Sequence, residues 1–214
     1  MGREFLDLFD EWAKDYDQAV IGKDPQYVEV FSNYEQILSE VANRSYGKVL
    51  EFGVGTGNLT KVLFDQGYDV VGIEPSTEMR KVAKQKLPAH IPIKEGDFLT
   101  FPLEKDVTTI VSSYAFHHLT DEEKEKAFNI YSSLLKKQGK VVFADTMFES
   151  DRAFTTIIEE AKEKGYNRLA EDLLSEYYTT IPNLKRIAED TGFTVHFTQL
   201  NDFVWILDAT KVKD

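Results

Sequence analysis

The segment KVLEFGVGTG, residues 48–57, decides the fold. Its apolar first half predicts a strand over 48–52, and a helix is expected over 59–66, after the glycines. Gly53 and Gly55 have no Cβ, so a ligand can approach the backbone closely, and the amides at the helix start attract polar groups. The segment therefore predicts a ligand-binding turn between a strand and a helix.

The spacing of these glycines narrows the class of ligand. A dinucleotide fingerprint would need its third glycine at position 58, which is Asn58; the third glycine is Gly57. A phosphate-binding loop would continue with lysine and then serine or threonine, and this chain does not. Glu51, at the end of the strand, would repel a pyrophosphate and suits a ligand that carries positive charge.

Outward from this turn, short apolar runs alternate with longer helical patterns. Such alternation requires crossover connections and predicts a mostly parallel sheet with helices on both faces. Asn201-Asp202 is typical of the tight connection of an antiparallel hairpin. We expect an α/β, Rossmann-like, seven-stranded, mostly parallel sheet that ends in this hairpin. Strands are predicted at 48–52, 69–73, 91–94, 108–112, 140–144, 193–200 and 203–209, and helices at 4–20, 25–43, 59–66, 77–87, from 120 up to Gly139, and at 182–191.

The chain of 214 residues is predicted to form a single domain, because no Gly/Ser-rich linker divides it. We expect four segments within it. They are an N-terminal helical cap (1–45), a cofactor-binding core (46–149), a helical lid insertion (150–181), and a closing helix with the antiparallel hairpin (182–214).

Composition excludes several classes of function. The net charge is −12, from 25 basic and 37 acidic residues, which argues against nucleic-acid or anionic-membrane partners. Cysteine is absent, which excludes disulfides, thiolate metal sites and cysteine nucleophiles. The N-terminus lacks a secretory pattern and no apolar run approaches ~20 residues, so a cytoplasmic protein, monomeric or homodimeric, is expected.

Residues that suit a ligand follow three further strands. Glu74 ends the second strand and could accept hydrogen bonds from both hydroxyls of a ribose. Asp97 and Phe98 follow the third, where they could bind an exocyclic amine and pack on an aromatic ring. Ser113 begins the polar end of the fourth strand. Ligands of open α/β sheets bind at this edge, so these strand ends together predict one binding site.

These motifs resemble those of class I S-adenosylmethionine-dependent methyltransferases, and more narrowly a group of small bacterial YrrT-like methyltransferases. The similarity covers most of residues 1–210 and includes LEFGVGTGNLT, GIEPS, GDFLTFP and IVSSYAFHHLTDEEK. The resemblance implies that S-adenosylmethionine is the cofactor, that Gly53 lies against it, that Glu74 holds its ribose and that Asp97 binds its adenine. Tyr16 resembles the N-terminal lid tyrosine of related enzymes. The implied reaction is in-line methyl transfer to a small molecule, with S-adenosylhomocysteine as the product.

The acceptor is less constrained by the sequence. The fourth motif lacks the Asp/Asn-Pro-Pro-Tyr/Phe pattern of enzymes that methylate bases or glutamine amides, which favours a small metabolite. His117 and His118 are the candidate general bases, although both could serve structure alone. No metal site is predicted, since the four histidines lack metal-ligand spacing. Three alternatives stay open: a nicotinamide-dependent dehydrogenase, against which the Gly57/Asn58 register argues, a cofactor-binding protein without catalysis, and a protein methyltransferase.

Overall fold

The computed structural model describes residues 24–212 together with positions 13, 16–18, 20 and 22. Most of the helix predicted over 4–20 lies outside the described residues, including the aromatic side chains of Phe5, Phe9 and Trp12. Its described part is the short helix α2 (Tyr16–Gln18). No helix among the described residues is long and apolar enough to cross a membrane.

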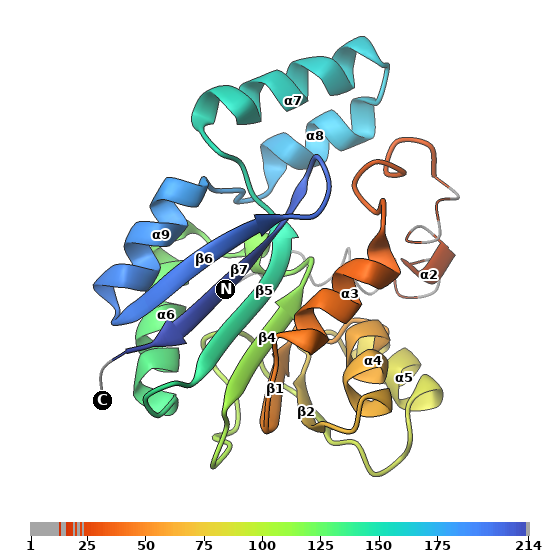
Figure 1. Ribbon diagram of the computed structural model, residues 1–214. Helices are drawn as coiled ribbons and strands as arrows, with labels where there is room; N and C mark the ends of the chain where they lie inside the picture. The colour runs from red at the N-terminus through yellow and green to blue at the C-terminus, as the bar shows by residue number, and fades with distance from the viewer. Residues whose placement is uncertain (1–12, 14–15, 19, 21, 23, 213–214) are drawn as a thin grey trace.

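A seven-stranded sheet forms the centre of the molecule, as predicted (Figure 1). Its order is β3-β2-β1-β4-β5-β7-β6; β7 lies antiparallel to both neighbours, and the remaining pairs are parallel. The strand ends of β1, β2 and β4 therefore meet at one edge. The strands are β1 (Lys48–Phe52), β2 (Asp69–Ile73), β3 (Ile93–Lys94), β4 (Thr109–Ser113), β5 (Lys140–Thr146), β6 (Phe193–Gln199) and β7 (Val204–Lys211).

Helices cover both faces of the sheet because successive strand residues point to opposite sides and both sides are apolar. Leu50 and Phe52 of β1 pack in one core cluster with α6 and α9, whereas Val49 packs in the other with α3, α4, α7 and α8. The helices are α3 (Tyr34–Asn43), α4 (Asn58–Asp65), α5 (Thr77–Lys86), the 3-10 turn η3 (Phe116–His118), α6 (Asp121–Leu134), α7 (Asp151–Glu163), α8 (Asn167–Ser175) and α9 (Ile181–Asp190).

Two helix-start signals of the sequence have their expected geometry. The Ser76 hydroxyl accepts a hydrogen bond from the backbone N–H of Met79, which caps α5. Thr120 and Glu123 form a reciprocal capping box at the start of α6. These caps fix the chain direction immediately after β2 and β4, the strands whose ends carry the candidate site.

The helix predicted over 25–43 is wrong in its first part. Residues 24–33 form turns, and α3 begins only at Tyr34. Asn33 takes the left-handed conformation (φ 63°), which interrupts a helix, and Phe31 packs instead against Tyr34 and Tyr114. Tertiary aromatic contacts therefore override the local helical pattern. The predicted end of α6 is also too late, because the helix stops at Leu134, five residues before Gly139.

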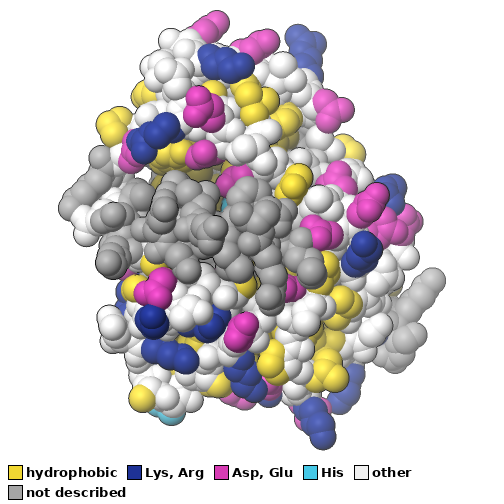
Figure 2. Space-filling view, turned by 180° about the vertical axis from the view of Figure 1, so that it is seen from behind, with side chains coloured by type: hydrophobic (Ala, Val, Ile, Leu, Met, Phe, Trp, Pro, Cys, Tyr) yellow, Lys and Arg dark blue, Asp and Glu magenta, His cyan; other side chains and the backbone are white. Residues whose placement is uncertain are grey.

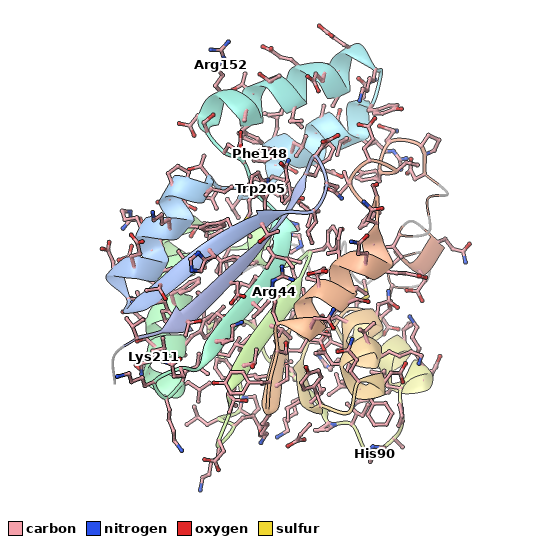
Figure 3. The ribbon with its side chains drawn as sticks, viewed as in Figure 1. Arg44, His90, Phe148, Arg152, Trp205 and Lys211 are labelled. Atoms are coloured by element: carbon pink, nitrogen blue, oxygen red, sulfur yellow. The ribbon has the colours of Figure 1, made fainter. Side chains whose placement is uncertain are left out.

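The α7–α8 segment leaves the sheet and returns to it at a single point. Phe148, just beyond β5, forms an isolated bridge with Thr180, and its carbonyl accepts a hydrogen bond from the Ile181 N–H at 2.8 Å. Figure 3 shows Phe148 below α7, at the end of the sheet from which this helix pair projects. The ring of Phe154 lies 4.7 Å from that of Phe148. This bridge anchors both ends of residues 150–181.

Lys211, labelled at the lower left of Figure 3, joins the last strand to α6. Its buried ammonium donates to the carbonyls of Ser132 (2.6 Å) and Leu135 (2.7 Å), which lie at the helix C-terminus. We expect Lys211→Met to lower the free energy of unfolding by about 1–3 kcal/mol in urea titrations, because it removes two charge-assisted hydrogen bonds. Lys136→Met is the control, since that side chain is 86% exposed and should change stability by less than ~0.5 kcal/mol. Equal losses would contradict this account.

Candidate active site

A cavity opens at the carboxyl ends of β1, β2 and β4, where the sequence places its motifs. It encloses about 780 Å³, counting the space where it meets solvent. Most of the predicted cofactor residues share this cavity. Of that predicted set, Tyr16, Gly53, Gly55, Glu74, Asp97, Phe98 and Ser113 line it, joined by Tyr34, Thr56, Asn58, Met79, Tyr114 and His118 among others.

The glycine loop forms the floor of this cavity, which we call the cofactor cavity. Gly53 and Gly55 have positive φ values of 68° and 55°, which L side chains rarely adopt. A Cβ on Gly53 would lie 2.6 Å from that of Ala115, so the loop also passes too close to the end of β4 for any side chain. The loop therefore needs glycine for conformation and for space at the same position.

The Glu74 carboxylate holds this loop against the next strand. The N–H of Gly55 donates to its Oε2, and the N–H of Ser76 donates to its Oε1, both at 2.8 Å. Glu74 is nevertheless part of the cavity wall. Because a carboxylate oxygen can accept two hydrogen bonds, Glu74 is fixed by the backbone and can still accept from ligand hydroxyls.

Asp97 is oriented in the same way. Its Oδ1 accepts from the backbone N–H groups of Leu99 (3.0 Å) and Thr100 (2.9 Å), although the residue is almost completely buried. Phe98 beside it stacks on Phe52 at 5.3 Å between ring centroids. These contacts present a carboxylate and an aromatic ring together at one end of the cofactor cavity.

Glu51 lies outside the lining of the cofactor cavity. It is buried beneath the loop, where the Thr60 hydroxyl of α4 donates to its Oε2 at 2.7 Å. Burial raises the pKa of Glu51 to about 8, and the neighbouring Glu74 charge adds to the shift. Its predicted part in cofactor binding stays a prediction; its shown contact supports the start of α4 from below.

The α2 segment closes over the loop through Asp17. Its Oδ1 accepts from the Thr56 hydroxyl (2.7 Å) and from Asn58 Nδ2 (3.1 Å), and its Oδ2 pairs with Lys86 Nζ at 2.6 Å. This network, the Asp17 clasp, places the neighbouring Tyr16 in the wall of the cofactor cavity. Figure 1 shows α2 at the right of the view, above α4 and α5.

A second cavity of about 820 Å³ adjoins the first, and we call it the acceptor cavity. The two share Tyr16, Met79, Tyr114 and His118 in their walls. Tyr114 follows β4 in the left-handed conformation (φ 51°), which is strained for a non-glycine residue. The acceptor cavity is further lined by Tyr27, Val30, Phe31, His117, Thr146, Leu169, Asp172, Leu173, Glu176, Tyr178 and Phe203.

The adjacent histidines have opposite environments. His117 Nδ1 lies 2.5 Å from Asp145 Oδ1, and its Nε2 lies 3.3 Å from Glu176 Oε2. Burial alone would lower the pKa of His117, but these two carboxylates outweigh it and raise the pKa. For His118, burial and the positive charges of His117 and Lys124 lower the pKa well below its usual value. His118 is therefore neutral near pH 7, whereas His117 is held between two acids.

Asp145, Asp172 and Glu176 were not singled out from the sequence as site residues. Asp145 had a signal, since it lies near the end of β5, the edge that already carries the other motifs. Asp172 and Glu176 had no such sequence signal, because they lie in α8 and at its C-cap and not at the end of a strand. Donor atoms of His117, His118 and Glu176 lie within 4.8 Å of one another, and both ring nitrogens of His117 already face carboxylates, Nδ1 facing Asp145 and Nε2 facing Glu176. The absence of a metal stays a prediction.

Comparison with known proteins identifies the family. Residues 49–139 match the family model described as a methyltransferase domain. The chain is 58% identical over 211 residues to an uncharacterised methyltransferase of Bacillus cytotoxicus. It is 57% identical over 211 residues to an uncharacterised methyltransferase of Bacillus mycoides. Each match covers 99% of this chain and 100% of the relative. This chain belongs to that family of methyltransferases.

The fold agrees with this assignment. The structure is similar, with a TM-score of 0.74 and 18% identity, to magnesium protoporphyrin IX methyltransferase from Synechocystis bound to S-adenosylhomocysteine; the match covers 99% of this chain and 100% of that one. The predicted class I methyltransferase and its predicted cofactor, S-adenosylmethionine, are confirmed. The cofactor cavity fits the group, because it joins a glycine-rich loop to two backbone-oriented carboxylates and an aromatic ring.

Glu51 predicts how stability of the protein without cofactor depends on pH. Its folded pKa of about 8 exceeds its ordinary value of 4.5, so between these values the unfolded chain loses a proton that the folded protein retains. Wild-type stability should therefore fall, relative to Glu51→Gln, as the pH rises from about 5 to 8.5, by about 2–5 kcal/mol. Urea titrations of both proteins at several pH values measure the difference. Parallel curves for the two proteins would show that Glu51 does not titrate in this window.

Proposed function

We propose that this methyltransferase transfers the methyl group of S-adenosylmethionine to a small molecule held in the acceptor cavity. The observation that carries the proposal is the shared wall of the two cavities, formed by Tyr16, Met79, Tyr114 and His118. A methyl donor in one cavity and a nucleophile in the other would meet there. The cytoplasmic location and the monomeric or homodimeric state remain our predictions.

The proposed cofactor-binding roles follow from the hydrogen-bond acceptors in the cofactor cavity. Glu74, fixed by two backbone N–H groups, accepts hydrogen bonds from the ribose hydroxyls, and Asp97 accepts from the adenine amine. When bound, S-adenosylmethionine supplies a methyl group made electrophilic by its sulfonium charge. The nearby carboxylates and the rings of Tyr16 and Tyr114 favour that charge, since cation–π contacts contribute about 0.5–2 kcal/mol.

The remaining contribution of the protein is alignment and exclusion of water. The Asp17 clasp closes the cofactor cavity on one side, and we propose that the α7–α8 segment is the lid of the acceptor cavity. An acceptor that carries a proton on its nucleophile must lose it near the shared wall. His118 lies in that wall, and Glu176 Oε1 is 3.8 Å from His118 Nδ1.

Isothermal titration with S-adenosylmethionine and S-adenosylhomocysteine tests the cofactor site. We expect micromolar binding, weakened by about 1–3 kcal/mol in Asp97→Ala because the substitution removes a buried acceptor. Glu95→Gln is the matched control, since that carboxylate lies two residues away and its side chain is 70% exposed. If neither ligand gave heat or a thermal shift, the glycine loop would serve another purpose and the proposed function would be wrong.

The Asp17 clasp makes a separate prediction. Asp17→Ala removes the contacts with Thr56, Asn58 and Lys86 and should weaken S-adenosylhomocysteine binding on the order of tenfold, or ~1.4 kcal/mol. Asp65→Ala is the control, because Asp65 forms only an exposed pair with Lys61 on α4. Stopped-flow dissociation should show faster ligand release from Asp17→Ala alone. Unchanged release would mean that α2 does not retain the cofactor.

A further inference from the structure

We propose that the acceptor is an amine that enters as an ammonium ion and is bound by the carboxylates of Glu176 and Asp172. This inference rests on the proposed function and names its substrate class. It depends on the charge, geometry and aromatic lining of the acceptor cavity.

Charge in the acceptor cavity favours a cation. Two carboxylates line it, and none of its described lining residues is lysine or arginine. Three positive charges lie beside it. His117 lies between Asp145 and Glu176, and the Lys124 ammonium donates to the carbonyls of Leu119 and Tyr177. Arg168 lies over the ring of the lining residue Tyr27 and pairs with Asp24. Four carboxylates, those of Asp24, Asp145, Asp172 and Glu176, thus face three cations. A carboxylate or phosphate acceptor would enter against this balance, whereas an ammonium ion would complete it.

The two carboxylate oxygens of Glu176 have different neighbours. Its Oε2 accepts from the Tyr178 hydroxyl at 2.6 Å and lies 3.3 Å from His117 Nε2. Its Oε1 accepts none of the hydrogen bonds found among the described residues, and it lies 3.8 Å from His118 Nδ1. The side chain is therefore held by one oxygen and presents the other beside a residue that lines both cavities.

Asp172 presents a second carboxylate from the same side. It lies four residues before Glu176, one helical turn away, so both project from one face of α8 and its C-terminal cap. The Tyr27 hydroxyl donates to Asp172 Oδ2, which fixes it against the turns of residues 24–33. Two carboxylates one turn apart suit an ammonium ion, which has up to three donors.

Aromatic rings complete the site. Tyr178 stacks on His117 with 4.8 Å between ring centroids, and Tyr16, Phe31 and Tyr114 line the opposite part of the cavity as a contacting group. Aromatic faces attract cations and provide an apolar surface for the carbon skeleton. Alcohols would benefit from the apolar contact but not from the charge.

The transfer step balances with groups of the two cavities. The ammonium gives one proton to Glu176 Oε1 and becomes a neutral amine with a lone pair. The nitrogen lone pair forms the new N–C bond, the C–S bond breaks, and its electron pair stays on sulfur. The products are a methylated ammonium ion and neutral S-adenosylhomocysteine, with the proton on Glu176 released to solvent afterwards. Glu176 is therefore the proposed catalytic residue, and Asp145 and Tyr178 are positioning residues.

Matched fragments test the preference in the full-length protein saturated with S-adenosylhomocysteine. 2-Phenylethylamine, 2-phenylethanol and 3-phenylpropanoate share one skeleton and differ in charge, and saturation-transfer NMR measures the binding of each. We expect the amine to bind best, and Glu176→Gln to weaken it at least tenfold. Glu171→Gln, an exposed glutamate on the same helix, should bind the amine as wild type does.

Each result separates this inference from the proposed function. Titration with S-adenosylhomocysteine comes first, and Glu176→Gln should bind it with wild-type affinity, which also shows that the variant is folded. If S-adenosylhomocysteine fails to bind wild type, the proposed function is wrong. If it binds, but the alcohol or carboxylate matches the amine, or none of the three fragments binds, the proposed function stands and the amine inference is overturned. Loss of amine binding in Glu171→Gln as well would also overturn it.

Discussion

The hydrogen bond from the Gly55 N–H to Glu74 Oε2 is the contact on which the rest of the site depends. It joins the turn after β1 to the end of β2 and holds a backbone conformation that only glycine adopts easily. With the turn fixed, α4 starts directly above the buried Glu51, and Asn58 and Thr56 face the Asp17 clasp. One carboxylate therefore positions a loop, a helix start and, through them, the segment that covers the cofactor.

The acceptor cavity is assembled differently, from parts far apart in the chain. Turns near Tyr27, the polar end of β4, and Glu176 after α8 meet only because both ends of residues 150–181 are anchored at Phe148. Its lining includes two carboxylates and, among the described residues, no lysine or arginine, whereas acidic and basic side chains are interspersed over the described part of the face in Figure 2. The electrostatic character of the cavity is thus local, and the overall charge of −12 does not by itself define it.

Sequence patterns predicted the fold well because its core segments obey local rules. The bounds of β1 and β2 and the capping box at Thr120 follow from apolar runs and cap chemistry within a few residues. The failures involve tertiary contacts. Residues 24–33 have a helical pattern, but Phe31 is drawn to Tyr114, and Glu176 carries no local signal because its partner His117 lies 59 residues earlier. The cofactor residues could be predicted from strand ends. The acceptor-cavity carboxylates Asp172 and Glu176 required the folded α7–α8 segment.

The crystal structure of the complex with S-adenosylhomocysteine is the most direct test of this account. The account predicts adenine beside Asp97 and Phe98, ribose hydroxyls on Glu74, and the sulfur atom directed at the wall shared by Tyr16, Tyr114 and His118, facing the acceptor cavity. A ligand bound away from Glu74, or a sulfur atom sealed off from the acceptor cavity, would contradict the claim that methyl transfer occurs across that wall.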